Sequence, residues 1–180
     1  MNKISKILLS FSLATLPLLA QTETTASLRK ISDGDTMTFH NNKGEIKCRI
    51  YGIDTPEKFK TAKFKKDMEV TGMSEKELKS AGEAATNYAK QRLHINSGYK
   101  LEIYDTDKYG RSLCVVYLNS GQSFNEKIVE DGYAVVYKRG KYTKNKELRH
   151  TLNQAQGRAV KSKAGLWRNY KILMESMAEN

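Results

Sequence analysis

The stretch that decides the fold is residues 27–53, which read SLRKISDGDTMTFHNNKGEIKCRIYGI. It contains three short runs rich in β-branched and aromatic residues, at 27–31, 36–40 and 46–53. The runs are separated by Asp33-Gly34-Asp35 and by Asn41-Asn42-Lys43-Gly44. Clusters of Asp, Asn and Gly between β-rich runs are strong turn signals. The stretch therefore predicts a three-stranded meander.

Helices are predicted in three places beyond this stretch. Ser74 and Glu77 form a capping box, and apolar residues then recur at helical spacing as far as Leu93. A short helix is expected over 123–130, and a last one over about 144–161, after which Trp167 is expected to pack the end of the chain onto the body. The lysine-rich segment 58–71 has little apolar periodicity, and we expect it to be an exposed loop.

Two further strands, over 99–104 and 111–118, bring the number of predicted strands to five. Five short strands with a helix between the third and fourth match the OB-fold, a five-stranded Greek-key barrel. The predicted fold class is therefore α+β, an OB-fold β-barrel with about three helices. Because the chain contains no internal repeat and no Gly- or Pro-rich linker, we expect one domain over 27–170 and a C-terminal tail over 171–180.

The charge of the chain and its first residues indicate partners and destination. Lys and Arg number 31 against 20 Asp and Glu, a net charge of +11, which favours contact with nucleic acid or an anionic membrane surface. Residues 1–20 have the build of a signal peptide, with cleavage after Ala20 or as late as Ala26. The apolar stretch 7–20 is shorter than the roughly 20 residues that span a bilayer, so we expect no permanent membrane anchor. The mature protein is expected to be secreted or periplasmic.

Cys48 and Cys114 each lie in an apolar, strand-like run. After export an oxidising environment permits one disulfide between them. Two small buried side chains that never pair are the equally acceptable alternative, and the sequence leaves both open.

Several polar residues lie where strands end or where apolar runs are interrupted. Asp35 and Asp54 each border a predicted strand beside a turn, where carboxylates from different strands converge and supply the oxygen ligands that hard cations take. Thr55 adds a backbone carbonyl, and Pro56 stiffens the turn that projects Glu57. Arg49 interrupts an apolar run, so it requires an anionic partner if it faces inward.

Taken together, three separated motifs resemble the staphylococcal nuclease (thermonuclease) family. They are Asp33-Gly34-Asp35-Thr36, Arg49 followed by Gly52-Ile53-Asp54-Thr55-Pro56-Glu57, and Asp107-Lys108-Tyr109-Gly110-Arg111. The resemblance runs from about Leu28 to Trp167 and includes the helix between the second and third motifs and the closing Gly165-Leu166-Trp167. It implies a calcium-dependent nuclease, acting on DNA and RNA, whose products carry 3′-phosphates.

The resemblance also implies a role for each matching residue. Asp35, Asp54 and the Thr55 carbonyl would bind Ca²⁺. Glu57 would be the general base, and Arg49 and Arg111 would be the phosphate clamps. Lys108 and Tyr109 resemble contacts to the terminal phosphate of a bound nucleotide. Tyr137 or Tyr142 would stack a base, although residues 133–145 align with the family only with a gap.

Two other classes of protein remain as alternatives. A non-catalytic OB-fold module that binds nucleic acid would keep the barrel and lose the chemistry, but the acidic and basic set expected for catalysis is complete. A basic adhesion or membrane-associated protein would explain the charge and the leader but not the carboxylates. We expect a monomer with no stable protein partner.

Overall fold

The computed structural model describes residues 21–138 and 145–179. Five strands close a barrel in the order β1-β2-β3-β6-β5, and β5 pairs back onto β1. All neighbouring strands are antiparallel except β3 and β6, which are parallel. The strands are β1 Thr22–Ile31, β2 Thr36–Asn41, β3 Gly44–Ile50, β5 Gly98–Thr106 and β6 Ser112–Tyr117. The predicted five-stranded barrel, including its opening meander, is confirmed.

Strand β1 begins before the expected domain start at residue 27. Residues 22–27 form an antiparallel ladder with residues 98–103 of β5, and this ladder closes the barrel. Cleavage after Ala20 would leave the ladder whole, whereas a cut after Ala26 would remove most of its β1 side. The predicted signal peptide, residues 1–20, lies outside the described residues.

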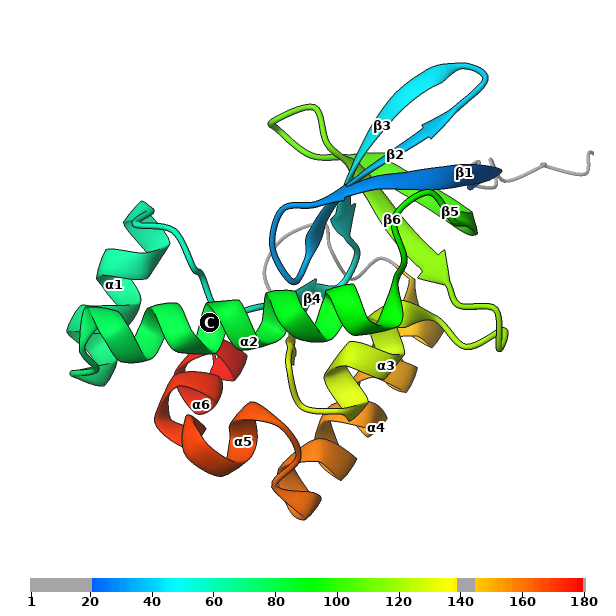
Figure 1. Ribbon diagram of the computed structural model, residues 1–180. Helices are drawn as coiled ribbons and strands as arrows, with labels where there is room; N and C mark the ends of the chain where they lie inside the picture. Colours follow the sequence, from blue (N-terminus) through cyan, green and yellow to red (C-terminus); the bar gives the residue numbers. More distant parts are fainter. Residues whose placement is uncertain (1–20, 139–144, 180) are drawn as a thin grey trace, which may run out of the picture.

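The helices pack below the barrel (Figure 1). The three expected helices are α2 Glu75–Arg92, α3 Phe124–Glu130 and α4 Lys146–Ser162, and α2 begins with the predicted Ser74–Glu77 capping box. The main core lies between these helices and the barrel, where Phe39, Leu101 and Phe124 are fully buried. No helix in the described part of the chain is long and apolar enough to span a membrane.

The prediction of a loop over 58–71 is wrong for all but its first four residues, because helix α1 spans Ala62–Thr71. The Thr61 side chain caps the first turn by accepting a hydrogen bond from the Phe64 backbone N–H, and Gly72 ends the helix in the left-handed conformation. Phe64 is only 2% exposed and packs in the same cluster as residues of the last helix. A single buried aromatic gives little periodicity, which is why the sequence pattern did not reveal this helix.

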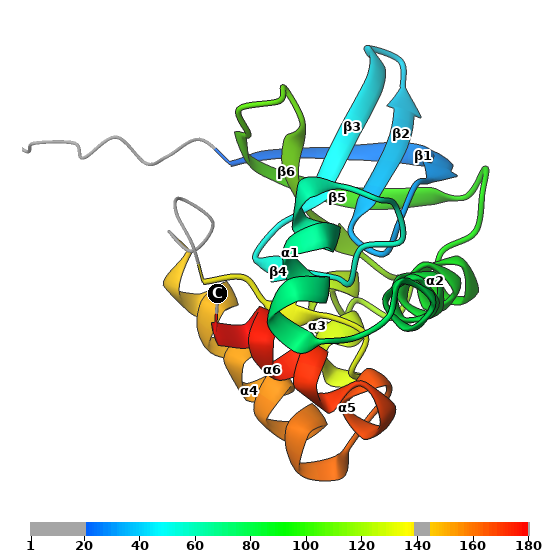
Figure 2. The ribbon, with the colours of Figure 1, turned by 90° about the vertical axis from the view of Figure 1, so that its left-hand side faces the viewer.

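Two more helices close the chain, α5 Leu166–Asn169 and α6 Lys171–Glu179. Trp167 packs with Leu78 of α2 and Met174 of α6 in a second core cluster, as expected for a residue that fixes the end of the chain. The segment expected to be a tail, 171–180, therefore carries a helix as far as residue 179. Figure 2 shows α6 lying between α1 and α4 on the helical side of the molecule.

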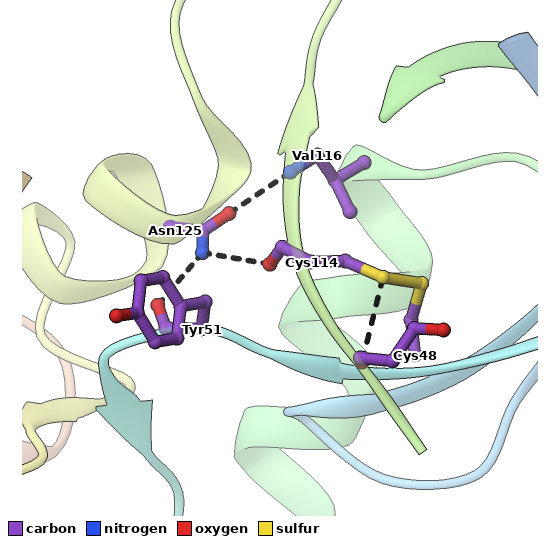
Figure 3. The surroundings of a disulfide bond; sticks show 6 residues. Cys48, Tyr51, Cys114, Val116 and Asn125 are labelled. Atoms are coloured by element: carbon purple, nitrogen blue, oxygen red, sulfur yellow. Dashed lines mark hydrogen bonds between the residues drawn. A yellow bond between two sulfur atoms is a disulfide. The ribbon is translucent and has the colours of Figure 1, made fainter. Parts of the chain in front are cut away.

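Cys48 of β3 and Cys114 of β6 form a disulfide across the parallel strand pair (Figure 3). Beside it, the fully buried Asn125 side chain donates hydrogen bonds from Nδ2 to the carbonyls of Tyr51 (2.8 Å) and Cys114 (3.2 Å). Its Oδ1 accepts one from the Val116 N–H (3.1 Å). The disulfide and Asn125 together hold β3, β6 and α3 in one arrangement.

Two remaining short strands, β4 Ile53–Asp54 and β7 Val135–Val136, form a separate antiparallel pair. This pair brings the chain after residue 134 next to the chain that leaves the barrel after β3. The Tyr137 N–H donates to the Gly52 carbonyl (2.9 Å) and extends the pairing.

Candidate active site

A cavity of about 620 Å³ opens where the turn after β1, the end of β3, the segment after β4 and the turn before β6 meet. Eight of the nine candidate residues line it: Asp35, Arg49, Asp54, Glu57, Lys108, Tyr109, Arg111 and Tyr137. The ninth, Thr55, is buried behind it and hydrogen-bonds to Asp35. Residues that are 102 positions apart in the sequence therefore share one cavity.

Arg49 connects the two candidate metal-binding carboxylates. Its guanidinium forms ion pairs with Asp35 and with Asp54, the latter at 2.7 Å, and its side chain is only 13% exposed. The other oxygen of Asp35 accepts hydrogen bonds from the Thr55 backbone N–H (2.9 Å) and hydroxyl (3.0 Å). The expectation that an inward-facing Arg49 needs an anionic partner is confirmed.

Two glycines permit close approaches that shape the cavity. A Cβ on Gly34 would lie 2.9 Å from the Thr55 methyl carbon, so this position must stay small for the turn to pack on Thr55. A Cβ on Gly82, in the middle of α2, would lie 2.5 Å from the carbonyl oxygen of Glu57 and 2.6 Å from the nitrogen of Lys58. The backbone that carries Glu57 therefore rests directly on helix α2.

Glu57 is half-buried, and burial is the main reason that its pKa is raised above the usual value. The positive charge of Lys63 lowers the pKa, while the carboxylates of Asp54 and Asp33 raise it further. A carboxylate with a raised pKa is a better proton acceptor than an ordinary surface glutamate. Burial likewise raises the pKa of Asp33, against the opposing influence of Arg49 and of hydrogen bonds from Thr36.

Arg111 enters the cavity from the turn between β5 and β6. The carboxylate of Asp107, four residues earlier, holds the Arg111 side chain: it accepts a hydrogen bond from the Arg111 Nε (2.7 Å) and forms an ion pair with the Arg111 Nη2 (2.7 Å). The same carboxylate accepts hydrogen bonds from the backbone N–H groups of Tyr109 and Arg111 (both 2.9 Å). Partial burial raises the pKa of Asp107, but these hydrogen bonds outweigh it and hold the pKa below the usual value. Among the described residues no second carboxylate pairs with Arg111, so its other guanidinium N–H groups can bind an anion in the cavity.

Lys63 of α1 also lines this cavity, and it is not among the residues that the sequence motifs predict for the site. Its Nζ lies 3.3 Å from an Asp54 oxygen, 3.4 Å from the Thr55 carbonyl oxygen and 3.2 Å from the buried Asp67. The expectation of an exposed loop over 58–71 places no particular lysine in the site. The one available signal was the spacing of Lys63 and Asp67, which places an ion pair on one face of a helix.

The oxygen atoms around Lys63 suit a hard divalent cation. One ammonium group already reaches both Asp54 and the Thr55 carbonyl, so these two oxygens lie within reach of a single cation. Asp35 is joined to them through Arg49. Within residues 21–138 and 145–179 no group of three or more His, Cys, Asp or Glu side chains is arranged to hold a metal ion. The backbone carbonyl and water must therefore complete any coordination shell here.

The three candidate substrate-binding residues lie at the rim. Tyr109 is 71% exposed, and its ring is approached by Lys108 Nζ at 5.0 Å and by the Arg111 guanidinium at 5.5 Å. Tyr137, which directly follows β7, also lines the cavity. Tyr142, the other candidate for base stacking, lies outside the described residues.

Comparisons with known proteins show which family the sequence resembles. The family model described as "Staphylococcal nuclease homologue" matches residues 47–169. The thermonuclease of Staphylococcus intermedius is 32% identical over 144 residues, which cover 78% of this chain and 74% of that protein. The thermonuclease of Staphylococcus hyicus is 31% identical over 151 residues, covering 82% and 78%. Endonuclease YhcR of Bacillus subtilis is 30% identical over 149 residues, or 81% of this chain but only 12% of that longer protein. A match that covers most of the chain in sequence, together with the closed barrel, shows that the chain belongs to the staphylococcal nuclease family.

Proposed function

We propose that this protein is a calcium-dependent nuclease that hydrolyses phosphodiester bonds in DNA and RNA. The observation that carries the proposal is the shared cavity of about 620 Å³, which is lined by Glu57 with its raised pKa, by two arginines and by three further carboxylates. Relatives named thermonuclease and endonuclease support the same reaction class.

Glu57 acts as the general base. It removes a proton from a water molecule that attacks the phosphorus atom, a role for which its raised pKa and its fixed backbone are suited. Arg49 approaches the cavity from β3 and Arg111 from the turn between β5 and β6, and both bind the phosphate oxygens through planar guanidinium groups. They stabilise the negative charge that grows in the transition state.

Asp35, Asp54 and the Thr55 carbonyl hold the calcium ion. When bound, calcium neutralises charge on the phosphate. In this structure the protein's own cations already contact these oxygens: Arg49 pairs with both carboxylates, and Lys63 contacts Asp54 and the Thr55 carbonyl. Metal binding therefore requires at least Lys63 to withdraw.

The products carry 3′-phosphates, as the family resemblance implies, so the bond between phosphorus and the 5′ oxygen breaks. Lys108 and Tyr109 contact the terminal phosphate of the bound nucleotide, and Tyr137 stacks on its base. Because the cavity addresses the phosphate backbone, both DNA and RNA serve as substrates.

The protein acts outside the cytoplasm as a monomer, after removal of residues 1–20. A disulfide between Cys48 and Cys114 fits an oxidising compartment, which supports export. The barrel ladder that begins at Thr22 supports cleavage after Ala20 rather than after Ala26. Mass spectrometry of the mature protein should therefore find Gln21 as the first residue, and an intact Met1 would reject cleavage.

The proposal is tested by incubating purified protein with end-labelled single- and double-stranded DNA and RNA, in calcium and in excess chelator. We expect cleavage only with calcium, with millimolar dependence because the site has few charged ligands, and 3′-phosphate ends on the products. Binding without cleavage under all conditions would instead identify a non-catalytic nucleic-acid-binding module.

A further inference from the structure

A second groove, of about 530 Å³, lies beside the active-site cavity. One wall is the segment 58–60, and the other is a face of helix α2 that includes Lys79, Asn87 and Lys90. Phe59 lines both this groove and the active-site cavity. The two are therefore adjoining parts of one surface, and we call the second part the flanking groove.

The walls of the flanking groove are held together by close packing. The backbone of Glu57 and Lys58 packs closely on Gly82, so the segment that carries Lys58 and the backbone of Glu57 share one support on α2. The groove is thereby fixed in position relative to Glu57, as a binding site for an extended substrate requires.

The charge in the flanking groove is positive. Its two acidic residues are paired with lysines: Glu75 with Lys60 at 2.8 Å and Glu83 with Lys79 at 3.8 Å. In the described part of the chain, Lys58 and Lys90 form no salt bridge. These two lysines leave the groove with a net positive charge on opposite walls.

The surroundings of Lys58 show that these charges are crowded. Burial is the main reason that its pKa is lowered, and the positive charges of Lys90 and Lys30 lower it further. Asp33 and Glu83 act in the opposite direction without cancelling the effect. A bound anion between the lysines would relieve this repulsion.

The groove also exposes an aromatic ring. Phe59 is 55% exposed, and the Nζ of Lys58 lies 4.9 Å from the centre of its ring. Proteins that bind single-stranded nucleic acid without sequence preference combine a basic groove with exposed aromatic side chains. The basic residues bind the phosphates, and the bases stack on the aromatic rings.

We propose that the flanking groove binds the part of the nucleic-acid strand that continues beyond the scissile phosphate. A backbone phosphate lies between Lys58 and Lys90, and a base stacks on Phe59. This inference rests on the proposed nuclease function, because it concerns the same substrate, and it assigns an additional contact region to residues outside the catalytic cavity.

The test compares a dinucleotide, which spans only the scissile bond, with a single strand of about a dozen nucleotides, a length in the range that single-strand-binding domains cover. The groove variant is Lys58→Met/Lys90→Met. The control variant is Lys65→Met/Lys76→Met, which removes the same charge from exposed positions on α1 and α2 that do not line either cavity. Circular dichroism checks that both variants are folded.

We expect the ratio of kcat/KM for the long substrate to that for the dinucleotide to fall about tenfold in the groove variant, mainly through KM, and to stay unchanged in the control. A second measurement needs no cleavage. The binding constant for the long strand is measured in chelator by fluorescence anisotropy at several salt concentrations. The slope of log K against log salt should decrease by about 0.7 for each lost phosphate contact in the groove variant only.

Equal effects in the two variants would overturn the inference and leave only a general surface charge. If the wild-type protein cleaves neither substrate, the proposed function fails. The salt dependence of binding then still decides whether the groove holds the strand, because it is measured without turnover.

Discussion

Replacing Gly82 with alanine should lower turnover by displacing Glu57. The added methyl carbon would lie 2.5 Å from the Glu57 carbonyl oxygen, whereas ordinary contacts begin at 3.4 Å, so the backbone must shift by about 1 Å. A misplacement of about 1 Å at a reacting group costs about 10²-fold in rate. Overpacking costs about 1–3 kcal/mol, and alanine in a helix interior returns about 0.5–1 kcal/mol. We therefore expect a folded protein, destabilised by about 1 kcal/mol, whose kcat is about a hundredfold lower.

The matched control is Gly157→Ala in helix α4. A Cβ there meets nothing within 4 Å, so the substitution should stabilise the protein by about 0.5–1 kcal/mol and leave kcat unchanged. Urea unfolding measures both stabilities, and initial rates on a labelled oligonucleotide measure turnover. If Gly82→Ala keeps the wild-type kcat, then the contact between α2 and the Glu57 backbone does not position the base, and the reasoning is refuted.

Three further outcomes follow from the same contacts. Arg49→Lys or Arg111→Lys keeps the charge but loses the planar pair of donors, so each substitution should lower kcat by about 10²-fold or more. Near wild-type turnover in both folded variants would show that these arginines do not act as phosphate clamps. Lys63→Met removes a cation that contacts two of the proposed calcium ligands, so calorimetry should show that the affinity for calcium rises about tenfold. Lys65→Met, on the exposed face of α1, should leave the affinity for calcium unchanged. Equal calcium affinities of the two variants would contradict a competition between Lys63 and calcium. Replacing both cysteines by serine removes the disulfide, which closes a loop of 66 residues, and should lower the free energy of unfolding by about 4 kcal/mol. A decrease of less than about 1 kcal/mol would show that the hydrogen bonds of the buried Asn125 hold β3, β6 and α3 together without the disulfide.

The barrel could be predicted from the sequence because its signals are local. The turns at 33–35 and 41–44 and the capping box at Ser74 each depend on a few neighbouring residues, and the structure has strands and a helix at those places. Helices α1 and α6 are harder to predict from local patterns, because both pack into a second core cluster that joins distant parts of the chain, with Phe64 and Met174 among its buried residues.

The candidate site was partly predictable for a related reason. The order and spacing of three motifs resemble those of the family, and this resemblance predicts the site residues Asp35, Arg49, Glu57 and Arg111. The structure places all four around one cavity. Lys63 was missed because its position depends on α1. The support of Glu57 by Gly82 was also missed, since a glycine inside a helix carries no sign of what approaches it.

The central claim is that Glu57 activates water for attack on a bound phosphodiester. Its most direct test is Glu57→Gln, which keeps the shape of the side chain and removes its ability to accept a proton. Turnover with calcium should fall by about 10²–10⁴-fold, while circular dichroism and the affinity for the long single strand in chelator stay close to those of the wild-type protein. Cleavage by purified Glu57→Gln at the wild-type rate would contradict the account.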